Sequence, residues 1–126
     1  MRPVPPMIEG GCLCGAVRFE IDGAPTRASR CFCSQCRKQS GTAFGAYAHV
    51  IAERSRFIAG EALVTAYASS AGVTRTFCSR CGSTLQWKRD GRVGFGIALG
   101  AIDGDPGVRP SLDLHPEDAA AWGPPD

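Results

Sequence analysis

The seven cysteines of this 126-residue chain fall into three short windows. The windows hold Cys12 and Cys14, then Cys31, Cys33 and Cys36, then Cys78 and Cys81. Cysteines buried for unrelated reasons would be scattered, whereas a metal ion about 2.3 Å from each sulfur needs ligands that tight local turns deliver together. The spacing therefore predicts thiolate-rich metal centres.

The first and last windows form a matched pair of chelating turns. Each ends in a glycine, Gly15 or Gly82, which permits the left-handed backbone conformation and lets backbone N–H groups turn towards a thiolate. Together they supply four sulfurs, enough for a closed tetrahedral Zn²⁺ site that would join the first strand to a late hairpin. The binding energy of such a site becomes folding energy. The alternative is that these four cysteines are reduced members of an apolar core.

The middle window, from Cys31 to Cys36, brings three sulfurs within reach of one ion. With the outer four cysteines assigned, a zinc ion here would have an open fourth position, which distinguishes catalytic sites from structural ones. One alternative is a second structural zinc with His49 or His115 as its fourth ligand. Another is a redox pair of Cys33 and Cys36, which the lack of a surrounding βαβ pattern disfavours.

A zinc ion held by three thiolates favours one kind of chemistry. The net negative charge of such a site acidifies a bound water less than three neutral histidines would, which disfavours a hydrolase. It suits activation of a substrate thiol, which must lose its proton to become the fourth ligand. Arg37 and Lys38 follow the window and would offset the charge or bind an anionic thiol substrate. The alternative for this pair is a solvated basic turn.

Alternation of apolar and polar residues predicts that strands position these windows. The expected strands are residues 17–21, 44–50, 63–67, 73–78 and 93–99. Residues 69–72 (Ser-Ser-Ala-Gly) predict the loop of a hairpin. Small residues at Gly94, Gly96 and Ala98, on one side of the last strand, indicate close approach by another sheet or a ligand.

Helical signals are few. Residues 34–40 predict a short helix with Ser34 as N-cap, and a proline followed by acidic residues and alanines predicts another over residues 116–122. The sequence thus predicts one antiparallel, all-β domain with minor helical turns. Residues 1–8 and the tail after Trp122 are expected to be loosely held.

The composition excludes several classes of protein. The 14 Lys and Arg nearly balance the 12 Asp and Glu, which argues against a polybasic nucleic-acid-binding module. No apolar stretch is long enough to cross a membrane, and the N-terminus lacks the apolar segment of a signal peptide. The length fits one domain. We therefore expect a cytoplasmic protein, in a reducing compartment, with no membrane or nucleic-acid partner.

Four motifs, taken with their order and spacing, carry a family resemblance. They read GGCLCGAVRF at residues 10–19, CFCSQCRK at 31–38, SGTAF at 40–44 and FCSRCGSTL at 77–85. Combined, they resemble the glutathione-dependent formaldehyde-activating enzyme (GFA) family, which includes centromere protein V. The resemblance covers residues 10–103, and the LGAID segment at 99–103 and Trp122 also look like family features.

The resemblance implies a fold and a set of cofactors. The fold would be a β-tent of two roughly orthogonal antiparallel sheets with zinc-binding knuckles. Residues 1–9 would form an N-terminal extension, 10–122 a single GFA-like zinc-binding domain and 123–126 a C-terminal tail. Two Zn²⁺ ions per chain are implied, one structural in the outer four cysteines and one in an open, catalytic site of the middle three.

The resemblance also implies an activity. In the founding activity of the family, formaldehyde and glutathione condense to S-hydroxymethylglutathione, formally a carbon–sulfur lyase reaction run in reverse. The chain is thus expected to be a zinc-dependent carbon–sulfur lyase-like enzyme acting on a thiol–aldehyde adduct, with a small-molecule thiol such as glutathione as partner. One position departs from the family, since Phe32 occurs where histidine is common. The alternative function is a non-catalytic zinc-binding structural or interaction module, which the open coordination position disfavours.

Overall fold

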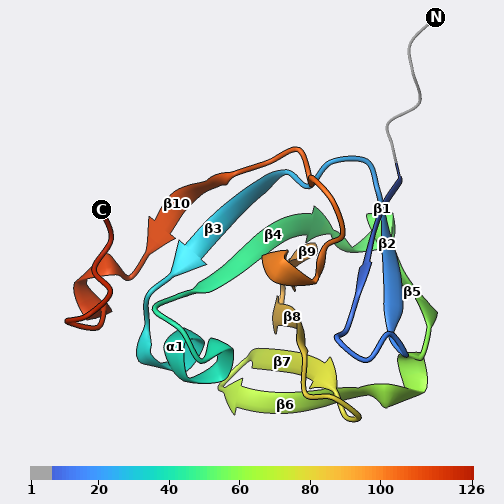
Figure 1. Ribbon diagram of the computed structural model, residues 1–126, viewed down its shortest axis with the longest axis horizontal. Helices are drawn as coiled ribbons and strands as arrows, with labels where there is room; N and C mark the ends of the chain where they lie inside the picture. The colour runs from blue at the N-terminus through green and yellow to red at the C-terminus, as the bar shows by residue number, and fades with distance from the viewer. Residues whose placement is uncertain (1–6) are drawn as a thin grey trace, which may run out of the picture.

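Short strands are the main regular element of the chain in the computed structural model, which describes residues 7–126 (Figure 1). The strands are β1 (Met7–Gly11), β2 (Arg18–Asp22), β3 (Arg27–Cys31), β4 (Gly45–Ile51), β5 (Ser55–Ala59), β6 (Val64–Ser70), β7 (Val73–Cys78), β8 (Thr84–Arg89), β9 (Gly94–Ala98) and β10 (Pro110–Leu114). Helix α1 spans Ser34–Ser40, and 3₁₀ turns span Ala52–Arg54, Glu61–Leu63, Leu99–Ala101 and Pro116–Asp118. The prediction of an all-β fold with minor helical turns is confirmed. In this described part of the chain, no helix has the length and apolar character to cross a membrane.

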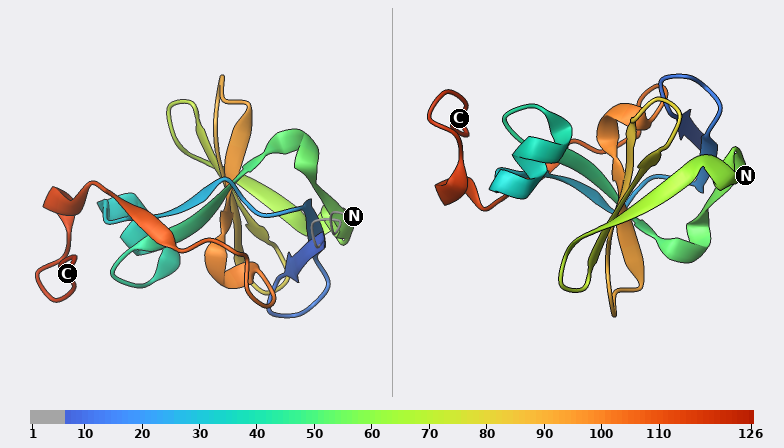
Figure 2. Two further views of the ribbon diagram at one scale, coloured as in Figure 1. Left: turned by 90° about the horizontal axis from the view of Figure 1, so that it is seen from above. Right: turned by 90° about the horizontal axis from the view of Figure 1, so that it is seen from below.

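The strands form two sheets. The smaller has the order β1-β2-β5 and the larger the order β10-β3-β4-β9-β8-β7-β6. Helix α1 and the C-terminal segment lie at the opposite end of the molecule from β1, β2 and β5 (Figure 2). One edge corrects the sequence-based prediction of purely antiparallel sheets, because β10 pairs with β3 in parallel. Residues 32–109 separate these two strands, so the rule that a tight turn cannot join parallel neighbours is satisfied.

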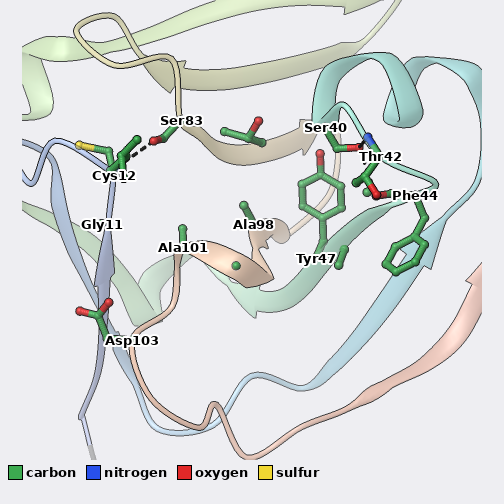
Figure 3. A pocket seen from close by; sticks show the side chains of 15 residues that line it. Gly11, Cys12, Ser40, Thr42, Phe44, Tyr47, Ser83, Ala98, Ala101 and Asp103 are labelled. Carbon is green, nitrogen blue, oxygen red and sulfur yellow. Dashed lines mark hydrogen bonds between the residues drawn. The ribbon is translucent and has the colours of Figure 1, made fainter.

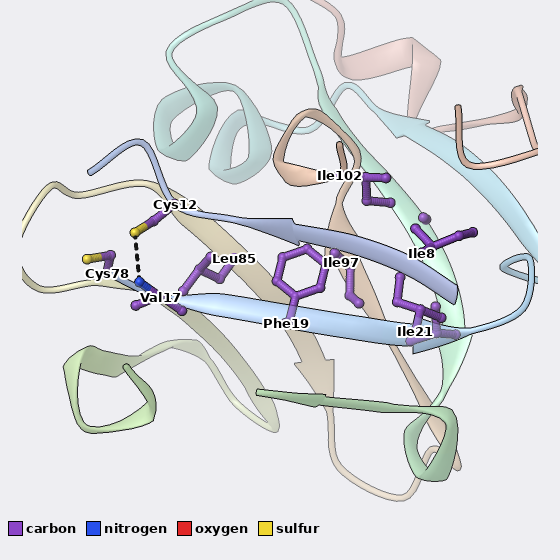
Figure 4. Packing of buried hydrophobic residues seen from close by; sticks show 11 residues of the cluster. Ile8, Cys12, Val17, Phe19, Ile21, Cys78, Leu85, Ile97 and Ile102 are labelled. Atoms are coloured by element: carbon purple, nitrogen blue, oxygen red, sulfur yellow. Dashed lines mark hydrogen bonds between the residues drawn. The ribbon is translucent and has the colours of Figure 1, made fainter. Parts of the chain in front are cut away.

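One face of the larger sheet packs against the smaller sheet and forms the core. Ala48 of β4 and Ile97 of β9 are cross-strand partners on this face and are almost fully buried. Phe19 and Ile21 of β2 pack in the same cluster from the smaller sheet, and Leu85 of β8 joins them (Figure 4). Because side chains alternate along a strand, the neighbours of these residues on the larger sheet point to its other face.

That other face, called the site face below, carries a row of polar and aromatic partners. The register places in this row Arg27 of β3, His49 of β4, Gly96 of β9, Trp87 of β8 and Arg75 of β7. Gly96 contributes no side chain, and a Cβ atom there would lie 3.1 Å from Cβ of Tyr47. The small residue thus accommodates a neighbouring tyrosine on β4.

The strands expected from the sequence are all present, as β2, β4, β6, β7 and β9, and β7 spans the expected residues 73–78. The turn before it is shorter than the expected loop 69–72, because β6 continues through Ser70. The sequence did not reveal β1, β3, β5, β8 or β10. In β3 only Ala28 is an apolar residue that faces the core, so alternation gave little signal.

Both expected helices need correction. Helix α1 covers the expected residues, but its N-cap is Cys33 rather than Ser34, because Sγ of Cys33 accepts a hydrogen bond from the Cys36 N–H at 3.4 Å. The second helix is only the 3₁₀ turn Pro116–Asp118. Ala119 leaves the helical region (φ −60°, ψ 146°), and so short a segment makes too few hydrogen bonds to offset the cost of nucleation.

The expectation that residues 1–8 are loosely held is wrong for the last two of them. Met7 and Ile8 belong to β1, and Ile8 is buried in the core. Pairing with β2 and this apolar contact hold the segment in place. Residues 1–6 lie outside the described residues.

Candidate functional site

The first and last cysteine windows meet between the two sheets. Cys12 and Cys14 lie in the loop between β1 and β2, while Cys78 ends β7 and Cys81 follows in the turn before β8. The four sulfur atoms all lie within 4.8 Å of one another. Sγ of Cys14 is 3.5 Å from Sγ of Cys12 and 4.0 Å from Sγ of Cys78. These residues, called the outer cluster below, join segments 64 positions apart in the chain.

Both turns of the outer cluster have the glycine geometry that the sequence predicts. Gly15 and Gly82 each have φ of +80°. Their N–H groups donate to the carbonyl oxygens of Cys12 and Cys78 at 3.0 and 2.7 Å. Because the chain turns back at Gly15, the N–H of Val17 can donate to Sγ of Cys12 at 3.2 Å. Hydrogen bonds of this kind favour the thiolate.

The donor set of the outer cluster fits a soft tetrahedral cation. Hydrogen bonds from Ser83 and from the backbone of Cys14 lower the pKa of the Cys81 thiol to about 5. The hydroxyl of Ser83 lies 3.2 Å from Sγ of Cys81. Four sulfurs at this spacing match a closed Zn²⁺ site of the structural kind.

The middle window forms a second group, called the middle cluster below, where β3 meets α1. Cys31 ends β3, Cys33 caps α1 and Cys36 lies in its first turn, with all three sulfurs within 4.8 Å of one another. Neither His49 nor His115 lies within that distance of all three, and no other histidine occurs in the chain. The interpretation of a structural site completed by histidine therefore gains no support.

A buried arginine of β7 lies against the middle cluster. Nη1 and Nη2 of Arg75 each donate to Sγ of Cys36 at 3.6 Å. Nη1 also donates to Oε1 of Gln39 at 2.7 Å, and Nε donates to Oγ of Ser69 at 3.0 Å. The Tyr47 hydroxyl donates to the same oxygen of Gln39 at 3.3 Å. This network fixes the guanidinium over the sulfur.

Hydrogen bonding divides the charge within the middle cluster unequally. A hydrogen bond from Cys31, followed by the hydrogen bonds and charge of Arg75, lowers the pKa of the Cys36 thiol to about 5 against the opposing effect of burial. The same interaction with Cys36 raises the pKa of Cys31. Burial raises the pKa of Tyr47 to about 12, so its phenol keeps its proton and remains a donor. The cluster therefore holds a thiolate at neutral pH.

A cavity of about 380 Å³ opens on the site face and is lined by all three sulfur-bearing residues of the middle cluster. Four cationic side chains also line it: Arg27, Arg75, Arg89 and Arg92. His49, His115, Tyr47 and Trp87 are further lining residues. No Asp or Glu is among the described residues that line it, so the cavity is suited to an anionic ligand.

His49 places a titratable group in this cavity. Its Nε2 is 2.8 Å from Oγ of Ser29, a buried residue of β3 that orients the ring. Burial, and then the charges of Arg27 and Arg92, lowers the pKa of His49 below its usual 6.5. The imidazole is therefore neutral at pH 7 and can accept a proton.

Three residues singled out from the sequence lie outside the cavity wall. Phe32 is almost fully buried, with its ring centroid 5.4 Å from that of Phe44. Nε of Arg37 donates to the carbonyl oxygen of Phe32 at 3.2 Å, and Lys38 is exposed on α1. The binding of an anionic thiol by Arg37 and Lys38 stays a prediction.

A separate cavity, of about 490 Å³, lies between the outer cluster and the start of β4 (Figure 3). On one side Oγ of Ser83 accepts a hydrogen bond from the N–H of Leu13 at 2.9 Å, and on the other lies the ring of Tyr47. Its carboxylate, Asp103, is already paired with Arg18 at 2.8 Å. Because no residue of the middle cluster lines this cavity, it is the weaker candidate for thiol chemistry.

Several residues of the cavity beside the middle cluster escaped sequence analysis. Arg75 carried a usable signal, because it lies between Val73 and Phe77, where alternation predicts an inward apolar side chain. A charge at such a position requires a buried partner. His49 was considered as a metal ligand but not as a proton acceptor. Trp87 and the remaining arginines carry no local signal, since their neighbours in the cavity come from other strands.

Comparisons with known proteins agree with one another. The model of the family described as "Glutathione-dependent formaldehyde-activating enzyme" (GFA) matches residues 7–118. A Halomonas elongata protein, named as a candidate glutathione-dependent formaldehyde-activating enzyme, is 39% identical over 94 residues, which are 68% of this chain and 58% of that protein. An uncharacterized lyase of Schizosaccharomyces pombe is 32% identical over 80 residues, 64% of this chain and 56% of that protein. The matched part of this chain thus spans less than two thirds of each of these relatives.

A solved structure supports the fold. The crystal structure of a Rhodobacter sphaeroides protein is similar with a TM-score of 0.65 and 25% sequence identity. The similarity covers 77% of this chain and 89% of that chain, so it includes most of both molecules.

Proposed function

Since this chain belongs to the glutathione-dependent formaldehyde-activating enzyme family, we propose that it makes and breaks the carbon–sulfur bond of a thiol–aldehyde adduct. In the direction of synthesis, the sulfur of glutathione or a similar thiol attacks the carbon of formaldehyde. The S–C bond forms, the π bond of the carbonyl opens, and one proton leaves the sulfur while one reaches the oxygen. The product is S-hydroxymethylglutathione when glutathione is the thiol, and the reverse direction is the lyase reaction.

One observation carries this proposal: the middle cluster lines a cavity whose other charged side chains are cations. A structural site would be closed by a fourth protein ligand, and neither of the two histidines provides one. A substrate in the cavity therefore has access to the sulfurs of the cluster. Cationic walls attract anions, and the thiol substrates of this chemistry carry carboxylates.

The donor sets of the two clusters support one zinc ion in each. Both clusters consist of sulfur alone, four atoms in the outer and three in the middle, which is the donor type that Zn²⁺ accepts in closed and open sites respectively. When bound in the middle cluster, zinc supplies a coordination position at which a substrate thiol is deprotonated near neutral pH. In the outer cluster, a zinc ion would stabilise the fold.

Arg75 is the residue placed to balance the negative charge of the middle cluster. Its guanidinium is buried and lies 3.6 Å from Sγ of Cys36, so its charge is poorly screened by water. Gln39 and Ser69 hold it in place. We propose that Arg37 and Lys38 assist from outside the cavity by adding to the positive potential that attracts an anionic thiol.

His49 is the residue placed to move the proton. It lines the same cavity as the middle cluster, and its neutral imidazole can accept the proton of the thiol. With Nε2–H donating to Oγ of Ser29, Nδ1 is free to take that proton and return it to the carbonyl oxygen. The residue thus supplies the proton transfer that Phe32, buried away from the cavity, cannot.

The proposal is tested by exchange NMR on the metal-loaded protein with ¹³C-formaldehyde and glutathione. We expect interconversion of formaldehyde and S-hydroxymethylglutathione above the spontaneous rate, lost in Cys33→Ser and His49→Gln. Arg54→Ala, an exposed arginine outside the cavity, is the control and should keep the full rate. If the wild type shows no acceleration while elemental analysis finds its middle site loaded, the structural-module interpretation is favoured.

A further inference from the structure

The cavity beside the middle cluster continues along the site face. A neighbouring cavity of about 650 Å³ shares five lining residues with it. The shared residues are Arg27, His49, Trp87, Arg92 and Gly96. The two cavities therefore form one groove that starts at the middle cluster and passes over Gly96, which contributes no side chain.

The length of this groove can be estimated along strand β3. Cys31 and Arg27 are at its two ends and point to the same face, because they are four residues apart. At ~3.3 Å per residue, their backbones are ~13 Å apart. A ligand that reaches from the middle cluster to Arg27 is therefore extended, with its sulfur at one end and the arginines around the other.

Three arginines that line the groove have no ion pairs among the described residues. Within residues 7–126, no carboxylate lies in salt-bridge contact with Arg27, Arg89 or Arg92. Other arginines are paired, for example Arg56 with Asp22 at 2.6 Å. The groove arginines are therefore cations without a carboxylate partner in the described chain.

The far end also has a fixed shape. The Arg92 guanidinium lies 5.5 Å from the centroid of the Trp87 ring, a cation–π contact that holds the two side chains together. Trp87, Gly96, His49 and Arg27 occupy one row of cross-strand partners, so the rigid sheet sets their spacing. No Asp or Glu is among the described residues lining either part of the groove.

We propose that Arg27 and Arg92, with Arg89 at the rim, form an anion subsite for the far end of an extended thiol substrate. The subsite binds carboxylate or phosphate groups, both of which accept paired hydrogen bonds from guanidinium. The lack of a carboxylate in the groove selects against a thiol whose far end bears an ammonium group. The subsite rests on the proposed function only in assigning the thiol end of its ligand to the middle cluster.

Isothermal titration calorimetry on the metal-loaded protein at pH 8, where His49 is neutral, tests the subsite. The probes are 8-mercaptooctanoate for the carboxylate, coenzyme A for the phosphate, and 8-mercaptooctanol and 8-amino-octanethiol as neutral and cationic counterparts. Suberate, a dicarboxylate without a thiol, tests the anion subsite alone. We expect the anionic thiols to bind at least about tenfold more tightly than their neutral and cationic counterparts.

The double variant Arg27→Ala/Arg92→Ala should bind both anionic thiols and suberate about tenfold or more weakly. Its affinity for 8-mercaptooctanol should be unchanged. Arg54→Ala, an exposed arginine outside the groove, is the matched control and should change nothing. Equal losses for charged and neutral thiols, or the same loss in the control, would overturn the subsite. A preference for only one of the two anionic thiols identifies which anion it binds.

The two proposals fail separately. Suberate binding that depends on Arg27 and Arg92 supports the subsite even if no turnover is found. Turnover of glutathione that the double variant leaves unchanged, together with suberate binding that is absent, overturns the subsite and leaves the proposed function intact.

Discussion

The guanidinium of Arg75 donates two hydrogen bonds to Sγ of Cys36, each 3.6 Å long. The two residues are 39 positions apart, one on β7 and the other in α1. Strand β7 ends at Cys78, so a single strand contributes the cation beside the middle cluster and a cysteine of the outer cluster. The two clusters are therefore joined by one strand, which sets the distance between them.

Arg75→Met keeps much of the side-chain volume but removes the charge and the donors. We expect the free energy of unfolding of the metal-loaded protein to fall by about 2–4 kcal/mol, because Gln39, Ser69 and a thiolate lose their buried partner. Urea denaturation followed by circular dichroism measures the change. Arg54→Met, an exposed position, should cost less than about 0.5 kcal/mol, and a similar loss in both variants would contradict the role of the network.

The sulfur clusters predict two zinc ions per chain. Protein purified without chelator should contain close to two equivalents of zinc by elemental analysis, and Cys33→Ser/Cys36→Ser close to one. Ser34→Ala, within the same turn, is the control and should keep both. A wild-type value near zero, with intramolecular disulfides detected by mass spectrometry, would refute the metal sites.

The clusters should differ in their contribution to stability. Cys14→Ser or Cys81→Ser should unfold the domain or lower its free energy of unfolding by several kcal/mol, because the outer cluster closes a loop between segments 64 positions apart. Cys33→Ser should lower the free energy of unfolding by less, because the cysteines of the middle cluster are close together in the sequence and close no long loop. Thermal unfolding of the three variants makes the comparison. Equal decreases in melting temperature would contradict the division.

The rate of adduct formation should depend on the ionisation of His49. Burial, followed by the charges of Arg27 and Arg92, lowers the pKa of this imidazole, so the neutral base is present at pH 7 and is lost only as the pH falls below its usual 6.5. The other charged or titratable groups of the cavity are Arg75, Arg89, His115, Tyr47 and the cysteines of the middle cluster. We expect kcat to fall on this acid side.

Two variants distinguish the contribution of His49 to the pH dependence of kcat from that of the thiols. Arg27→Ala should raise the pKa of His49 and move the acid limb of kcat to higher pH, while His49→Gln should lower kcat by about 100-fold and remove the limb. Metal content measured at each pH shows whether the cluster stays loaded. An acid limb that persists in His49→Gln with the metal still bound would exclude this base.

Restoring histidine at position 32 should not restore a catalytic group. Phe32 is buried against Phe44 and does not line the cavity, so Phe32→His should destabilise the protein by about 1–3 kcal/mol through a buried imidazole and leave the pH profile unchanged. Phe32→Leu, which adds no polar group, should cost less. A higher kcat or a new limb in Phe32→His would show that this side chain reaches the substrate.

Much of the chemistry was determined by the sequence alone. Cysteines within a few residues of one another, such as Cys31, Cys33 and Cys36, are brought together by local turns, so their spacing predicts a cluster without knowledge of the fold. Glycine at positions 15 and 82 is likewise a local requirement, because only a residue without Cβ adopts φ near +80° easily. The alternation of side chains that predicted β7 is also local, because it is a pattern of successive residues within a single strand.

The surroundings of the middle cluster were decided only by the tertiary structure. Arg75, His49 and Trp87 come from three strands, and the register of those strands places them on one face with the cysteines. The parallel pairing of β10 with β3 is equally nonlocal. Register depends on packing between sheets and on loop closure, which involve partners far apart in the chain. A sequence read residue by residue therefore reveals the candidate ligands of a metal but not the shape and charge of the cavity beside them.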